Sequence, residues 1–186
     1  MKSRIYVVAL SAFALLPLAS SAQQTSAVAP QTSPVADAFR DYAKSSAKNL
    51  IAAAEAFPAA KFAYKPTPSQ MSVGDIAVHL AQGNDYLCGT IAGVKAPDRP
   101  KIAATDSKET LMARLRDTFA FCDQALASLT DAGLAEELPF FGGRKMTRAA
   151  VITLTTGDWA DHYSQYANYL RLNGMLPPTA RRPAAQ

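Results

Sequence analysis

The most restrictive stretch of the chain is GDWADHYSQYANYLRLNG, Gly157 to Gly174. We expect it to belong to one helix that covers residues 147–173. Within that helix Asp158, His162 and Gln165 share a face with apolar residues, because side chains three and four positions apart lie above one another. A buried carboxylate or imidazole is costly unless it is paired or binds a metal. The stretch therefore predicts a long helix with an inward polar group that needs a partner.

Three more helices are expected upstream of this one. Apolar residues at helical spacing predict them over residues 35–57, 72–92 and 107–130. Ser72 and Thr147 are good N-cap residues for the second and fourth helices. Gly142 and Gly143 mark a turn before the fourth helix, and no alternating pattern predicts a strand elsewhere. Burial of the four apolar stripes predicts an all-α fold, a four-helix bundle.

The beginning of the chain resembles a secretory signal peptide. Lys2 and Arg4 precede an apolar run that ends near Leu18, and small residues follow at positions 20–22. The run is shorter than the roughly 20 residues that span a bilayer, and no later segment predicts a membrane span. We expect cleavage after residue 22 and a mature protein that is periplasmic or secreted.

The rest of the chain divides into three parts by composition. Residues 23–34 are rich in Gln, Ser, Thr and Pro and are expected to form a flexible leader, and residues 177–186 a flexible tail. Residues 35–176 have the size of a single domain. The formal charge of +4 falls to +2 when the two basic residues of the signal peptide are removed, and the remaining basic residues are scattered. This distribution argues against nucleic-acid binding.

The chain has two cysteines, Cys88 and Cys122, both in predicted helices. An even number of cysteines in an oxidising compartment favours a disulfide between them. Two separate buried thiols are the alternative. A catalytic thiol is disfavoured, because neither cysteine has a histidine near it in the sequence.

The chain also has two histidines, His79 and His162. His79 lies in the second predicted helix and can face the interior of a bundle. Together with Asp158 the two histidines would offer two imidazoles and one carboxylate, a set that suits Zn²⁺ or Fe²⁺ with open positions. A hydrogen-bonded core pair of Asp158 and His162 is the simpler alternative, and spacing leaves both open.

Three segments resemble the DinB-like superfamily of small metalloproteins: MSVGDIAVHLA at 71–81, RKMTRAA at 144–150, and 161–174 followed by two prolines. The resemblance implies a four-helix bundle with an unusual crossover, often dimeric. It also implies a divalent metal held by one histidine of the second helix and two of the fourth. Carried over by position, the ligands are His79, Asp158 and His162. Aspartate thus replaces the family's middle histidine, and Zn, Ni and Fe are the candidate metals.

Residues beside these ligands have two interpretations each. Gln165 would hydrogen-bond a ligand or close a helix contact, and Asp75 would orient His79 or cap its helix. The aromatic residues of the fourth helix are expected to be core.

Three functions follow from this pattern. The first is a metal-dependent transferase or hydrolase acting on a small molecule, which the resemblance favours. The second is a non-catalytic bundle that binds a metal, a ligand or a second copy in a homodimer. In the third, the polar trio is a closed hydrogen-bond network with a structural role.

Overall fold

The computed structural model describes residues 32–181. The predicted signal peptide, residues 1–22, lies outside the described residues, as do residues 23–31 of the leader and 182–186 of the tail. Cleavage and export therefore remain predictions.

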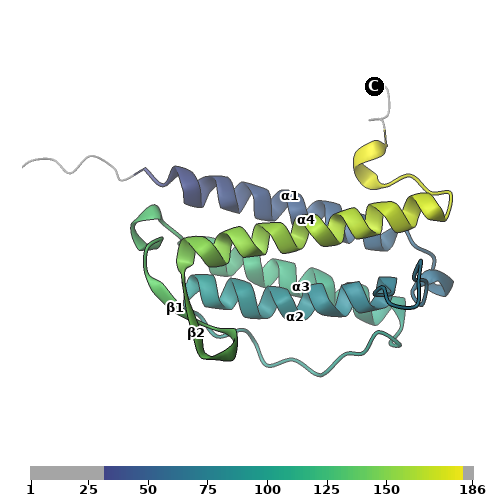
Figure 1. The fold of residues 1–186 in the computed structure, drawn as a ribbon, viewed down its shortest axis with the longest axis horizontal. Coiled ribbons are helices and arrows are strands. Elements are labelled where there is room, and N and C mark those ends of the chain that lie inside the picture. Colours follow the sequence, from purple (N-terminus) through teal and green to yellow (C-terminus); the bar gives the residue numbers. More distant parts are fainter. Residues whose placement is uncertain (1–31, 182–186) are drawn as a thin grey trace, which may run out of the picture. The chain divides into compact units, whose positions relative to one another are not determined.

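Four long helices make up most of the described chain and lie side by side (Figure 1). They are α1 (Pro34–Glu55), α2 (Val73–Ala92), α3 (Lys108–Leu126) and α4 (Arg148–Leu172). Each matches a predicted helix to within a few residues. The prediction of an essentially helical fold is confirmed.

The N-caps of α2 and α4 are the predicted ones. The backbone N–H of Asp75 donates to Ser72 Oγ at 3.1 Å, and Asp75 Oδ2 accepts from the backbone N–H of Ser72 at 2.9 Å. These reciprocal bonds form a capping box, and hydrogen bonds from Ser72 hold the pKa of Asp75 below its usual value. On α4, the backbone N–H of Ala150 donates to Thr147 Oγ1 at 3.2 Å. Both helices that carry candidate ligands thus begin at fixed positions.

Helices α2 and α3 run in the same direction. Asn84 Nδ2 donates to Thr118 Oγ1 at 3.3 Å, and Cys88 is bonded to Cys122 one turn further along both helices. Parallel neighbours cannot be joined by a tight turn, so residues 93–107 run back along the length of α2 (Figure 1).

Helix α4 runs antiparallel to α2. Near its C-terminal end Tyr166 Oη donates to the carbonyl of Val73 at 3.1 Å and Tyr169 Oη to that of Met71 at 3.0 Å, both at the beginning of α2. Tyr166 is fully buried, and burial raises its pKa far above the usual range. These two hydrogen bonds fix the C-terminal part of α4 against the beginning of α2. The preceding turns of α4 therefore lie beside the first half of α2.

Trp159 fills the centre of the core. It is buried, stacks on Phe39 with ring centroids 6.0 Å apart, and donates from Nε1 to Asn84 Oδ1 at 2.8 Å. The prediction that the aromatic residues of this helix are core is confirmed for Trp159, Tyr166 and Tyr169. By contrast Leu172, whose helical spacing from Asp158, His162 and Gln165 predicts a place on the same inward face, is 65% exposed because α4 ends there.

A short hairpin precedes α4, and the expectation of no strands was wrong there. Strands β1 (Glu137–Phe140) and β2 (Arg144–Thr147) pair antiparallel. Gly142 and Gly143 join them with φ of 67° and 73°, in the left-handed region that glycine adopts freely. The predicted turn is therefore present, with a strand on each side of it.

The first residues of the predicted tail are packed against the helices. Residues 178–180 form one turn of 3-10 helix that contacts α1. The backbone N–H of Thr179 donates to Tyr163 Oη at 3.2 Å, and the two hydroxyl groups lie 2.8 Å apart. At the other end Pro34, assigned to the leader, is the first residue of α1. Helical structure thus occurs just outside residues 35–176 at both ends, and the division into domains stays a prediction.

The predicted disulfide is present. Cys88 and Cys122 are buried and bonded, with Cα atoms 5.2 Å apart. Such a bond is typical of an oxidising, non-cytoplasmic environment. Within residues 32–181, no helix combines the length and apolar character needed to cross a membrane.

We expect the double variant Cys88→Ala, Cys122→Ala to lose stability. The bond closes a loop of 34 residues, so its removal lowers the free energy of unfolding by roughly 3 to 4 kcal/mol in the chain-entropy model. Urea unfolding of the wild type and the variant, each with and without reductant, measures this difference. Reductant should destabilise only the wild type. A wild-type protein that unfolds at the same urea concentration with and without reductant would contradict the expectation.

Candidate metal centre

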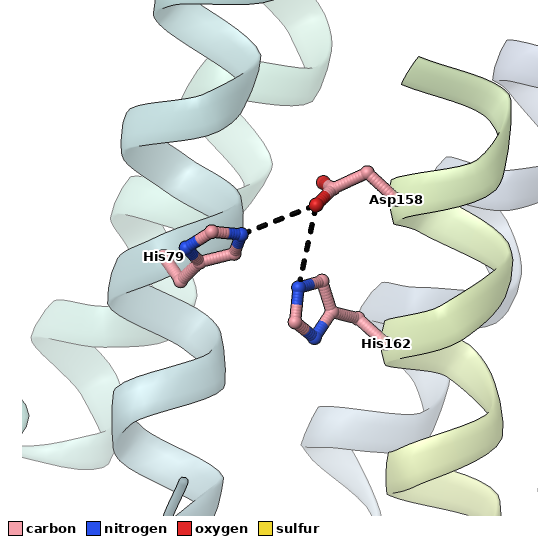
Figure 2. A group of neighbouring side chains, drawn as sticks. All are labelled: His79, Asp158 and His162. Carbon is pink, nitrogen blue, oxygen red and sulfur yellow. Dashed lines mark hydrogen bonds and ion pairs between the residues drawn. The ribbon is translucent and has the colours of Figure 1, made fainter. Parts of the chain in front are cut away.

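The three predicted ligands come together between α2 and α4. His79 projects from α2, and Asp158 and His162 project from successive turns of α4 toward it (Figure 2). Each offers one ligand atom, and these atoms all lie within 4.8 Å of one another. Residues 79 positions apart in sequence thus form one compact group of donors.

One carboxylate oxygen links the two rings. Asp158 Oδ1 lies 3.2 Å from His79 Nε2 and 3.4 Å from His162 Nε2 (Figure 2). An ionised carboxylate only accepts hydrogen bonds, so each ring directs an Nε2–H at the same oxygen. The ring centroids are 4.5 Å apart and the planes are tilted by 59°. Both histidines therefore direct their Nε2 atoms at Asp158 Oδ1.

Exposure differs sharply across the group. The side chain of His162 is 7% exposed, that of Asp158 21% and that of His79 47%. The group is therefore enclosed on the α4 side and open to solvent beside His79. One turn beyond His79, a Cβ at Gly83 would lie 3.9 Å from Asp158 Oδ2. The glycine leaves the second carboxylate oxygen uncovered on this side.

The charges in the group stabilise one another. Burial alone would raise the pKa of Asp158, but hydrogen bonds from His162 and His79 outweigh it and hold that pKa well below its usual range. The hydrogen bond that His79 donates to Asp158 in turn raises the pKa of His79. Asp158 is thus a carboxylate at neutral pH, which is the form that binds a cation.

One polar atom of the group has no partner among the described residues. His162 Nδ1 is buried and makes no hydrogen bond there. In the neutral ring with Nε2 protonated, Nδ1 is an unused acceptor. The trio is therefore not a closed hydrogen-bond network, which weighs against a purely structural role.

The predicted neighbours of the site have other partners. Gln165 Nε2 donates to Asp161 Oδ2 at 2.8 Å, and this pair faces solvent. In this arrangement the Gln165 amide does not contact the ligand group, and its supporting role there stays a prediction. Asp75 caps α2 at Ser72, which accounts for the residue without a contact to His79.

Asn84 connects α2 to both α3 and α4, and no role was predicted for it from the sequence. Asn84 receives the Trp159 N–H and donates to Thr118, so it touches α3 and α4 from α2. The signal was an asparagine between Leu80 and Leu87 on the buried stripe of its helix. A buried amide at such a position needs partners on the facing helices.

The geometry agrees with a comparison to known families. The sequence profile of the DinB superfamily matches residues 43–166 and so includes all three candidate ligands. The chain belongs to the DinB superfamily. No curated protein matches it at a significant level.

Solved structures of superfamily members share the fold. A DinB-like protein from Bacillus cereus is 18% identical, with a TM-score of 0.63 over 76% of this chain and 95% of its own. A DinB-like protein from Bacillus subtilis is 21% identical, with a TM-score of 0.62 over 78% of this chain and 99% of its own. At these identities the likeness concerns the fold alone.

We expect Asp158→Asn to lower the pKa of His79, because the amide cannot replace the carboxylate that stabilises the protonated ring. NMR titration of the His79 ring in chelator-treated protein measures the shift. Asp161→Asn is the matched control, since Asp161 pairs with Gln165 and should leave the His79 titration unchanged. An unchanged His79 pKa in Asp158→Asn would mean that the observed hydrogen bond does not govern this ring.

Proposed function

We propose that this chain is an exported divalent-metal protein of the DinB superfamily, with a DinB-like four-helix bundle. Its ligands would be His79 Nε2, Asp158 Oδ1 and His162 Nε2. The observation that carries the proposal is the convergence of one ligand atom from each of these three side chains, from two helices, within 4.8 Å of one another.

The donor set suits a divalent ion. Two imidazole nitrogens and one carboxylate oxygen are a common set for Zn²⁺ and also bind Ni²⁺ or Fe²⁺. His79 Nε2 and His162 Nε2 both already face Asp158 Oδ1, so these are the atoms that would hold the ion. Asp158 adds a negative charge that a third histidine would not supply, so this site should hold its ion with less residual positive charge.

The chain's own residues would divide the work by burial. His162 is enclosed and fixes the inner side of the site, while His79 stands at the solvent side. Gly83 itself adds no side-chain atom beside Asp158 Oδ2. A divalent ion held there would supply Lewis acidity toward a small molecule that enters from this side. We therefore propose a metal-dependent transferase or hydrolase.

A non-catalytic bundle that binds a metal or ligand is the second candidate. The observation that favours it is Asp158 itself, which stands where the superfamily motif has histidine.

The buried disulfide supports the proposed location outside the cytoplasm, since it would form and persist in an oxidising compartment. A homodimer is proposed from the superfamily resemblance.

We expect the protein, purified without an affinity tag, to contain one divalent ion per chain. Elemental analysis should find the ion lost in His79→Ala and His162→Ala and weakened in Asp158→Asn. Gln165→Ala is the matched control on α4 and should keep the metal. Protein that holds no metal after purification and after incubation with Zn²⁺, Ni²⁺ or Fe²⁺ would overturn the proposal.

Activity screens then separate the two candidates. Metal-loaded protein is tested for thiol transfer and ester hydrolysis beside His79→Ala. Turnover that disappears with the metal ligand supports the enzyme, whereas bound metal without turnover favours the binding protein.

A further inference from the structure

A second feature of the described chain is a cleft on the outer face of α2. Residues 94–102 form one wall of this cleft, which has a volume of about 810 Å³, and β1 closes one end. Along α2 the cleft begins at Gln82 and continues through Asp85, Tyr86 and Gly89. None of the three candidate metal ligands lines it. A cleft of this volume is within the range that holds small molecules.

Backbone contacts join the wall to α2 at Gly89. A Cβ at Gly89 would lie 2.8 Å from the carbonyl oxygen of Val94, so the glycine lets the wall approach α2 closely. The backbone N–H of Val94 donates to the Gly89 carbonyl at 3.0 Å. Gly93 makes the reversal between them with φ of 70°.

Two arginines tie the outer wall to the helices. Arg114 Nη2, on α3, donates to the carbonyl of Pro100 at 2.9 Å. Arg99 Nε donates to Asp85 Oδ2 on α2 at 3.1 Å, and its Nη2 to the carbonyl of Asp117 at 3.4 Å. The outer wall is thus bonded to both α2 and α3.

Flat rings form the end of the cleft at the hairpin. The Tyr86 ring stacks on Phe141, with centroids 3.8 Å apart. The centroid of the Phe140 ring is 5.8 Å from that of Tyr86. Tyr86 and Phe140 line the cleft, together with Leu138. Such a surface suits a flat apolar group, because aromatic rings favour stacked and edge contacts.

The charge of the cleft is positive. Four basic side chains line it against two acidic ones, Asp85 and Asp98. Asp85 pairs with Arg99 and Asp98 with Lys95, each at 3.1 Å. Lys101 and Arg114 form no ion pair within 4 Å among the described residues. The lining therefore has a net positive charge of two (4 − 2), which favours an anionic ligand.

We propose that this cleft binds a small organic anion with a flat apolar body. The apolar body lies against Tyr86 and Phe140, and the anionic group lies near Arg114 and Lys101. The proposal goes beyond the metal site and does not depend on it.

The test uses 2-naphthoate as the probe, with uncharged 2-naphthamide as its matched analogue. Titration of the full chain, followed by amide NMR shifts and calorimetry, should give saturable binding of 2-naphthoate at millimolar concentration. The shifts should fall on residues 82–102 and 138–140. The loss of one charge-assisted hydrogen bond should weaken the affinity about tenfold, so 2-naphthamide should bind more weakly by that factor or more.

Variants locate the two parts of the ligand. Lys101→Gln, at an exposed residue, should weaken 2-naphthoate binding without changing that of 2-naphthamide. Arg114→Gln also loses the bond to Pro100, so it should weaken both and the anion more. Tyr86→Ala should weaken both. Arg116→Gln is the matched control on α3, because Arg116 pairs with Glu55 outside the cleft. It should change neither, and nor should His79→Ala.

Three outcomes would overturn the proposal. They are no saturable binding of either probe, equal affinities for the anion and the amide, and shifts confined to another face of the molecule. Because Lys101→Gln leaves every described contact of the wall in place, an unchanged affinity in a folded Lys101→Gln protein would also count against it. Loss of metal in His79→Ala with 2-naphthoate binding intact would show that the cleft and the metal site are independent.

Discussion

The hydrogen bond that Trp159 donates to Asn84 fixes how α4 is rotated relative to α2. The rest of the structure depends on this orientation. Asn84 lies on α2, accepts from α4 and donates to Thr118 on α3. Trp159 is next to Asp158 in sequence, so the bond that buries its indole also sets the rotation of α4. That rotation turns Asp158 and His162 toward His79. A buried polar contact with every atom satisfied is specific in a way that apolar packing is not.

The parallel course of α2 and α3 accounts for a second property of the fold. Because the chain must return along α2 before α3 begins, residues 93–107 lie over a helix face that would otherwise be exposed. The cleft of about 810 Å³ is the space between this return segment and α2. The metal site and the cleft thus lie on the same helix but have separate origins. One comes from helix packing and the other from chain topology.

Periodicity within a helix carried the successful predictions. Asp158 and His162 are one turn apart on α4, and His79 is the chain's other histidine, in a second predicted helix. The resemblance to the superfamily pointed to the same three residues. The disulfide was predicted from the cysteine count and the expected compartment. The hairpin was missed because Leu138 and Phe140 alternate over four residues only, too short a pattern to compete with helix. The Gln165 amide instead bonds Asp161 one turn earlier on the same helix, a local alternative that helical spacing allows. The contacts of Asn84, and the cleft, depend on residues distant in sequence, which no local pattern encodes.

The position of the disulfide has a mechanical consequence. Cys88 and Cys122 join α2 to α3, so His79 belongs to a covalently braced pair of helices, whereas Asp158 and His162 lie on a helix that this bond does not reach. The three donor atoms therefore lie on both sides of the seam between α2 and α4, an interface held together by noncovalent contacts. An ion bound there would be a brace across that seam, and its binding energy would add to the free energy of keeping α4 docked. The lifetime of the folded protein would then follow the supply of that ion in its surroundings.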